Sequence, residues 1–425
     1  MWNYVPFEEA VEICDTQRKP INNKDRARRI EGKKKDSLYP YYGATGQVGY
    51  IDDYITDGEY VLLGEDGAPF LNTFAKKAYI ISGKTWVNNH AHVLKSKTNN
   101  KFLCYYLNYF NYSGYVSGTT RLKLTQGQMK HIKIPDVSIE EQNRIVSRIE
   151  ELFSELDKGV ETLQIIKKQL AVYRQAVLKA AFEGKFSYEW RNKGTESIAE
   201  DYNSIVRQKQ VFKDTSGDEN AVHLEIPNGW KIARLGELFD VQVGATPSRK
   251  NVEYWNGTIN WISSGEVHFN TIFHSNERIT HEGLTHASTN VQPIGTVMLA
   301  MIGEGKTRGQ AAILKTEAAH NQNTAAILVS ETPCSSKYVY YFLQLNYDNT
   351  RRVGSGNNQK ALNKERVRAL RIPFTSFAEQ DYIVDEIESR LSVCDSIEQT
   401  VDTALSQAEA MRQSILKKAF EGGLN

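Results

Sequence analysis

The chain has 425 residues, more than one ordinary globular core holds, so its length predicts two domains with connecting elements. Apolar residues make up 40% and charged residues 24%, a composition that excludes a largely disordered chain. Lys and Arg together number 52 and Asp and Glu 51, so any nucleic-acid partner has to meet local basic patches.

The four cysteines lie far apart and none belongs to a Cys-x-x-Cys pair, which argues against a zinc module and predicts free thiols. Residues 1–12 lack the basic start and apolar core of a secretory signal. No apolar run approaches the roughly 18 residues of a membrane helix. We therefore expect a cytoplasmic protein that has no membrane partner and binds no metal.

Residues 1–136 are expected to form the first globular domain. Short apolar strands, such as residues 60–63 and 79–81, alternate with turns rich in Gly and Asn, and residues 102–109 predict a short helix. A cluster of basic residues near the start has the charge to bind phosphates, the alternative being a solvated mobile loop. The candidate DNA-binding residues of this domain are Arg18, Lys19, Arg26, Arg28, Arg29, Lys33, Lys34, Arg121 and Lys123.

His90 and His92 follow two asparagines in the same domain. Alternation along a strand would place both imidazoles on one face, where they could hold a metal or bind bases. No acidic or thiol ligand lies near them in sequence, so a structural role with satisfied hydrogen bonds is favoured.

A long helix is predicted at residues 137–187. It starts after an Ile-Pro pair with a capping box at Ser138 and Glu141, and Gly184 stands where a helix would stop. Between them, apolar residues recur with a mean spacing of about 3.6, the period of one helix face. The positions expected to pack against another helix are Ile145, Ile149, Leu156, Leu163, Leu170 and Val177.

The same segment is repeated near the end of the chain. Residues 372–422 align with residues 134–184 without a gap, and 21 of 51 positions are identical. The repeat predicts a second long helix at residues 375–425. Its expected packing positions are Ile383, Ile387, Leu391, Val401, Met411 and Ile415.

Each of these helices has a single apolar stripe and would extend for roughly 65 Å, so it needs an equally long partner. We expect the two helices to pair with each other as an antiparallel coiled coil. The alternative is that each helix packs along its own domain.

A linker at residues 188–228 leads to a second domain at residues 229–374. Residues 230–238 (WKIARLGEL) echo residues 2–10 (WNYVPFEEA), which extends the repeat into the domains. Strands are predicted at residues 297–301 and 325–329 and a helix at 338–345. The candidate DNA-binding residues are Arg249, Lys250, Lys306, Arg308, Arg351, Arg352, Asn357 and Lys360.

The sequence therefore predicts a mixed α/β (α+β) fold. Two irregular globular domains are joined by two long helices, and an internal pseudo-two-fold repeat relates the halves of the chain.

Distinctive strings follow one another along both domains. They are residues 41–53 (YYGATGQVGYIDD), 64–69 (GEDGAP), 86–94 (WVNNHAHVL), 244–250 (GATPSRK), 254–267 (YWNGTINWISSGEV), 295–314 (GTVMLAMIGEGKTRGQAAIL) and 321–326 (NQNTAA). With a Glu-Gln pair opening each long helix, this ordered set resembles the specificity subunits of type I restriction-modification systems over nearly the whole chain.

The resemblance implies that each globular domain is a target-recognition domain that reads one half of an asymmetric, bipartite sequence in double-stranded DNA. It implies that the paired helices set the spacing and dock two methyltransferase subunits. It also implies ATP-dependent restriction and translocation subunits. Adenine methylation and cleavage would belong to those partners, and this chain would need no cofactor.

Three enzyme motifs can be tested directly against the chain. Gly-Lys-Thr occurs at residues 83–85 and 305–307, but the glycine that a P-loop needs five positions earlier is Ala78 or Ala300. The two parts of a nuclease-like pattern, Pro-Asp and Glu-x-Lys, lie at opposite ends of the first long helix, too far apart to form one metal site. An amino-methyltransferase would need a Pro-Pro pair in its catalytic motif, and the chain has none. We therefore expect a non-catalytic subunit. The alternatives are a nuclease or fused methyltransferase with an unrecognised active site, or a coiled-coil scaffold without a nucleic-acid role.

Overall fold

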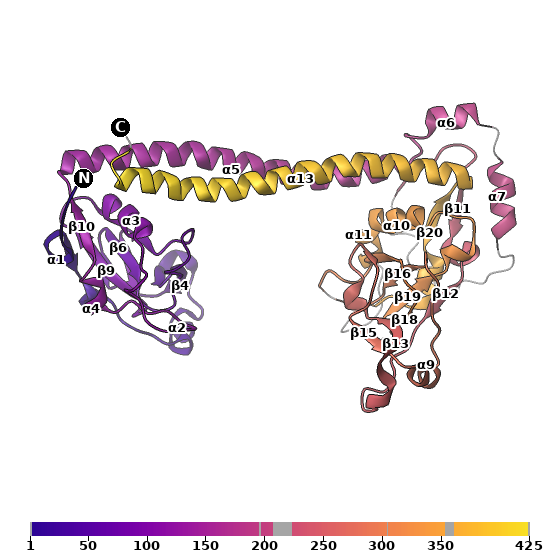
Figure 1. Cartoon of the computed structure of the whole chain (residues 1–425), viewed down its shortest axis with the longest axis horizontal. Coiled ribbons are helices and arrows are strands. Elements are labelled where there is room, and N and C mark those ends of the chain that lie inside the picture. The colour runs from indigo at the N-terminus through magenta and orange to yellow at the C-terminus, as the bar shows by residue number, and fades with distance from the viewer. Residues whose placement is uncertain (1, 195–196, 207–222, 304, 353–360, 424–425) are drawn as a thin grey trace. The chain divides into compact units, whose positions relative to one another are not determined.

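The computed structural model describes residues 2–194, 197–206, 223–303, 305–352 and 361–423 (Figure 1). The chain forms two compact units: unit 1 comprises Met1–Lys167 with Gln399–Asn425, and unit 2 comprises Lys168–Glu398. Each unit mixes helices and strands, which confirms the predicted fold class. None of the described helices has the length and apolar character needed to cross a membrane.

Unit 1 contains two small sheets and one isolated strand pair. The first sheet has the order β2-β9-β6-β7, the second the order β4-β3-β8-β5, and β1 pairs with β10. Its strands are β1 (Asn3–Pro6), β2 (Val11–Ile13), β3 (Tyr39–Gly43), β4 (Gly46–Ile51), β5 (Thr56–Asp57), β6 (Tyr60–Gly64), β7 (Ala78–Ile81), β8 (Lys84–Val87), β9 (Ala91–Ser96) and β10 (Lys133–Asp136). Its short helices are α1 (Phe7–Ala10), α2 (Asn23–Ile30), α3 (Asn100–Tyr109) and α4 (Gln126–Met129). Strand β6 is buried at every position, so it lies at the centre of the domain rather than half exposed.

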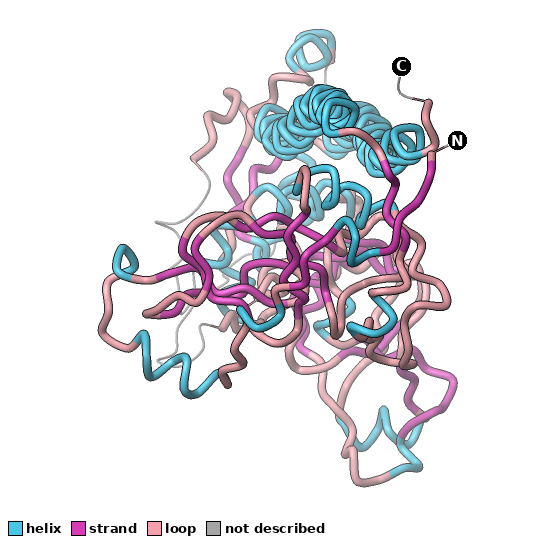
Figure 2. Tube along the Cα trace, turned by 90° about the vertical axis from the view of Figure 1, so that its left-hand side faces the viewer, coloured by secondary structure: helices cyan, strands magenta, loops and turns pink. Residues whose placement is uncertain are grey.

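Unit 2 is built in a similar way from one larger and one smaller sheet. The five-stranded sheet has the order β12-β19-β16-β17-β14, the three-stranded sheet the order β15-β13-β18, and β11 pairs with β20. Its strands are β11 (Lys231–Arg234), β12 (Val241–Val243), β13 (Trp255–Ile262), β14 (Asn270–Ile272), β15 (Glu277–Ile279), β16 (Val297–Ala300), β17 (Ala311–Leu314), β18 (Ala318–His320), β19 (Thr324–Ile327) and β20 (Arg371–Phe374). Its short helices are α6 (Tyr188–Lys193), α7 (Ile198–Ile205), α8 (Leu235–Leu238), α9 (His281–Ala287), α10 (Ser336–Leu345), α11 (Tyr347–Arg352) and α12 (Lys364–Ala369). Figure 2 shows short strands joined by loops, and loops are where binding residues most often lie.

Two long helices, α5 (Ile139–Phe182) and α13 (Phe377–Phe420), have 44 residues each and run from one unit into the other. Both begin as predicted, because Ser138 and Ser376 accept hydrogen bonds at 3.3 Å from amides three residues on. Both end at a glycine with a left-handed backbone, Gly184 at φ 64° and Gly422 at φ 82°. Local capping signals therefore fix the length of each helix.

The repeat seen in the sequence is present in the contacts of each unit. In unit 1, β1 pairs antiparallel with β10, and in unit 2, β11 pairs in the same way with β20. Just beyond, Gln142 Nε2 donates to Val137 O at 2.9 Å, and Gln380 Nε2 donates to Thr375 O at 3.0 Å. The Glu-Gln pair at each helix start therefore has a structural role, since its glutamine ties the first helical turn to the residue that follows the preceding strand.

The two long helices pair antiparallel within unit 1. Lys167 Nζ lies 2.7 Å from Asp402 Oδ1, and Arg412 forms an ion pair with Asp157. The partner's number falls as the number along α5 rises, so the chains run in opposite directions.

The same pairing recurs within unit 2. Arg174 Nη2 lies 2.7 Å from Asp395 Oδ1 and 2.9 Å from Glu398 Oε2. The sequence shift that superposes the repeats carries Asp157 onto Asp395 and Arg174 onto Arg412. The repeat therefore preserves an ion pair between the helices. Its arginine comes from α13 in unit 1 and from α5 in unit 2.

The predicted packing stripe is for the most part buried or half-buried. The buried positions are Ile145, Ile149, Leu170, Val177, Ile383, Ile387 and Val401, and the half-buried ones are Leu156, Leu163, Leu391 and Ile415. Near the helix ends the stripe also packs on the globular domain: Ile145 and Ile149 share a buried cluster with Phe102 and Phe420, and Ile383 shares one with Phe342. The sequence offered two alternatives, that the helices pair with each other or that each packs on its own domain. Both occur together.

Met411 is the exception among these positions, because 54% of its side chain area is exposed. Its neighbours take the inner face: Ala408 is buried, and Arg412 forms the ion pair with Asp157. A small difference between the average period of about 3.6 residues and the true period accumulates over many turns. At Met411 the predicted position therefore falls at the edge of the interface.

Candidate nucleic-acid interface

The middle of the basic cluster of the first domain is a helix, and the cations on either side of it lie in loops. Residues Asn23–Ile30 form α2, and the Asn22 side chain caps it by accepting a hydrogen bond from the Asp25 amide at 2.9 Å. Arg28 points to solvent, with 77% of its side chain accessible, and its ion pair with Asp25 is long at 3.5 Å. Lys19, Lys33 and Lys34 are also exposed.

Other cations of the same cluster hold α2 and its neighbours in place. Arg29 Nε and Lys33 Nζ each lie 2.6 Å from the Asp52 carboxylate, and their hydrogen bonds, that of Lys33 foremost, lower the pKa of Asp52. Arg26 lies over the Tyr41 ring at 4.9 Å and donates to the Val48 carbonyl at 3.3 Å. These contacts fix the helix and leave Arg28 on its exposed face.

Arg18 is half-buried. It forms ion pairs with Asp15 and Glu65, and 19% of its side chain is exposed. Near it, His92 is fully buried, with Nδ1 2.8 Å from Asp15 Oδ2 and Nε2 3.0 Å from Leu124 O. Both His92 nitrogens are therefore satisfied, which confirms the structural role favoured for it.

His90 does not share a strand face with His92, contrary to the alternation that the sequence suggested. It precedes β9 and lies 3.4 Å from Asp66 Oδ2 through Nδ1. Arg121, another predicted DNA-binding residue, has 60% of its side chain exposed and lies 2.7 Å from Asp66 Oδ1 through Nε. Lys123 is half exposed and pairs with Glu65 at 3.5 Å.

In unit 2, the exposed Arg249 lies against two tryptophans, of which Trp261 is buried. Its guanidinium lies 3.8 Å from the centre of the Trp255 ring and 5.2 Å from that of Trp261. Glu277 binds both of its Nη nitrogens, and this hydrogen bonding lowers the pKa of Glu277. The adjacent Lys250 is exposed. Stacking and the bidentate pair hold Arg249 rigidly at the surface.

Two further arginines of unit 2 donate hydrogen bonds to backbone carbonyl oxygens. Arg308 is 6% exposed and donates through Nη2 to Arg351 O at 2.7 Å, while Arg351 Nη1 donates to Arg308 O at 3.3 Å. This reciprocal pair of hydrogen bonds joins the loop after β16 to α11. Lys306 of the same loop is exposed. Arg352 ends α11, and Asn357 and Lys360 lie outside the described residues.

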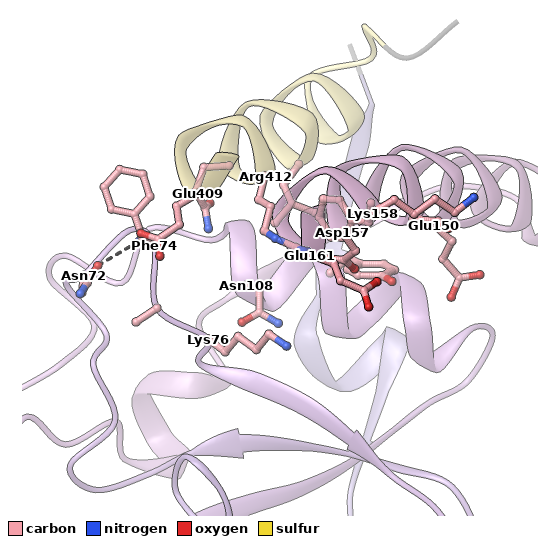
Figure 3. Close-up of a pocket in the computed structure, with 16 residues that line it drawn as sticks. Asn72, Phe74, Lys76, Asn108, Glu150, Asp157, Lys158, Glu161, Glu409 and Arg412 are labelled. Carbon is pink, nitrogen blue, oxygen red and sulfur yellow. Dashed lines mark hydrogen bonds and ion pairs between the residues drawn. The ribbon is translucent and has the colours of Figure 1, made fainter. Parts of the chain in front are cut away.

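A large cavity lies in unit 1, where α3 and residues 72–76 face α5 and α13 (Figure 3). It has a volume of about 910 Å³. Its charged lining residues are Glu150, Asp157, Glu161, Glu409, Lys76, Lys158 and Arg412. Carboxylates are at least as numerous as cations there, so this cavity lacks the positive excess that DNA phosphates need. Within the described part of the chain, no three His, Cys, Asp or Glu side chains are grouped to hold a metal.

The sequence analysis missed Asp66 and Trp255, which contact the candidate residues Arg121 and Arg249. Both lie in strings that were noted for their order along the chain, GEDGAP and YWNGTINWISSGEV. A rule that searches for cations passes over the carboxylates and aromatic rings that orient them.

Comparison with known proteins supports a specificity subunit. The family model for the type I restriction modification DNA specificity domain matches residues 2–167 and again residues 227–407. The EcoDI specificity subunit of Escherichia coli is 24% identical over 398 residues, covering 92% of this chain and 83% of that protein. The EcoBI specificity subunit of Escherichia coli is 24% identical over 408 residues, covering 93% and 79%.

Solved structures share the fold. A chain from a type I restriction-modification system, solved to explain complex assembly and conformational transition, has a TM-score of 0.66 and 16% identity, with 100% of this chain and 98% of that chain covered. The HsdS subunit from Thermoanaerobacter tengcongensis has a TM-score of 0.50 and 16% identity, with coverage of 100% and 97%. The family model and the relatives from Escherichia coli favour the specificity subunit over the enzyme alternative.

Proposed function

Because the chain belongs to the type I restriction-modification DNA specificity family, we propose that it is the DNA-reading, non-catalytic subunit of such a complex. Each globular domain reads one half of an asymmetric, bipartite target in double-stranded DNA. The recognition domains are residues 1–136 and 229–374, the spacer helices are residues 137–187 and 375–425, and residues 188–228 link the halves.

One observation carries this proposal: the same framework is built twice. Each unit has a strand pair, a glutamine-tied helix start and an ion pair between antiparallel helices. Two copies of one recognition domain suit a target with two separate halves. The copies share a framework but differ in their surface loops, which suits the recognition of two different sequences. Exposed cations on loops and on α2 supply the phosphate contacts in this account.

The helices are proposed to form a coiled-coil spacer and to dock two methyltransferase subunits. In unit 1, apolar side chains of α5 and α13, among them Leu156 and Met411, line a groove of about 650 Å³. In unit 2, Tyr173 takes the repeat position of Met411 and is 50% exposed, and Val172 beside it is 71% exposed. Two related apolar patches fit two copies of one partner.

Methylation of adenine and ATP-dependent translocation and cleavage are assigned to the partner subunits, and the complex is placed in the cytoplasm with its DNA. The test is to co-express the chain with its methyltransferase and to map modified adenines across a genome. We expect one bipartite motif with a fixed spacer. A continuous motif, or modification that does not depend on this chain, would refute the proposal.

A further inference from the structure

A second hollow of unit 1 has a different character from the large cavity beside the helices. It has a volume of about 720 Å³ and is lined by four loops: the β3–β4 turn, the β6–β7 loop, the β8–β9 loop and residues 120–122. The polar side chains that it presents include Asp66, Asn88, His90 and Arg121. Apolar atoms of Val48, which is 50% exposed, lie beside them.

Backbone hydrogen bonds hold these loops together. Gly67 N donates to Leu122 O at 2.9 Å, and Glu65 N donates to His90 O at 2.8 Å. Asn88 N donates to Tyr42 O at 3.1 Å. Each loop is thus tied to a neighbour before any ligand arrives, which lowers the entropic cost of binding.

Gly67 makes room for the arginine that crosses the hollow. Its φ of 79° is strained for other residues, and a Cβ there would lie 3.1 Å from Arg121 Nε. Asp66 holds the same Nε at 2.7 Å and is itself 3.4 Å from His90 Nδ1. The carboxylate therefore holds the guanidinium on its Nε side, and among the described residues neither Nη nitrogen of Arg121 donates a hydrogen bond.

We propose that this hollow is a base-reading site of the first recognition domain and that Arg121 reads a guanine there, with both Nη nitrogens donating to O6 and N7. The inference rests on the proposed function and deepens it. The forked pair of Nη donors matches the major-groove edge of guanine, which presents two acceptors.

A base edge suits this site better than a phosphate. Asp66 places a carboxylate beside the guanidinium, and it would repel a phosphate but not an uncharged base. Arg28 on the outer face of α2 is more exposed, so positioning on the DNA backbone falls to that helix. Asp66 keeps acceptor capacity for an amino group of a neighbouring base.

The test uses the complete complex with its methyltransferase and two variants, Arg121→Ala and Arg121→Lys. Lysine keeps the charge but loses the two-pronged donor. The matched control is Lys130→Ala, which removes a cation of the same unit that is paired with Glu8 and does not line the hollow. Modified adenines are mapped across a genome, and binding is measured on duplexes that differ at one base pair.

Both Arg121 variants are expected to relax one guanine position in one half-site, with discrimination falling by roughly 5- to 150-fold. The other half-site and the control variant should keep the wild-type motif. An unchanged motif in both variants overturns the inference, as does equal weakening on all sequences that lysine restores, which is the mark of a phosphate contact. Loss of all modification by both variants also counts against it. These failures leave the wild-type bipartite motif intact, whereas failure of the proposed function would remove that motif in the wild type.

Discussion

Lengthening both long helices at matched positions should lengthen the spacer between the half-sites. Lys167 faces Asp402, so insertion of four residues after Gln164 in α5 and of four after Leu405 in α13 places the additions opposite each other. Four helical residues add about 6 Å and turn each helix by about 40°, so the apolar stripe continues across the insertion. At about 3.4 Å per base pair, the mapped target should gain about two base pairs of spacer with both half-sites unchanged.

Two controls make this prediction sharp. Insertion into α5 alone should abolish methylation, because the ion pairs Lys167–Asp402 and Asp157–Arg412 cannot then both keep their register. The same four residues placed after Lys193, at the exposed end of α6, should leave the target as it is. If the matched insertion leaves the spacer unchanged, or alters the bases that are read, the helices do not set the spacing.

Three further predictions follow from named contacts. Replacing Arg28 and Lys34 by alanine should reduce the slope of log affinity against log salt by up to about 1.8, measured on the assembled complex; an unchanged slope would leave α2 without a DNA contact. Tyr173→Asp should remove one of two bound methyltransferase copies in size-exclusion chromatography with light scattering, and retention of both copies would contradict the docking surface. Phe182→Ala should lower the free energy of unfolding by about 3–5 kcal/mol, because its fully buried ring packs within 4.9 Å of the ring of Tyr338. Val172→Ala, at an exposed position, should change it by less than about 0.5 kcal/mol in the same denaturant titration.

The long helices could be predicted closely because their signals are local. The prediction of residues 137–187 came from a capping serine, an apolar period and a terminal glycine, and the structure gives Ile139–Phe182. The repeat supplied the second helix in the same way. Met411 was misplaced because an average period does not specify which residue of a turn faces inward at a distant point.

The roles of individual cations could not be predicted because their partners are distant in sequence. Arg18 binds Glu65, 47 residues away, and Arg308 binds the backbone of Arg351, 43 residues away. A cation looks the same in sequence whether it faces solvent or holds two loops together. Tertiary contacts decide which role a cation has, and they leave Arg18 half-buried and Arg308 buried.

The central claim is that two copies of one framework each read their own half-site, and exchanging a domain tests it most directly. A chain in which residues 1–136 are replaced by a second copy of residues 229–374 should be co-expressed with the methyltransferase and its modified adenines mapped. The account predicts a target that contains the second half-site twice, in inverted orientation, because the helices pair antiparallel in each unit. A target that keeps the original first half-site, or is unrelated to either half, would contradict it.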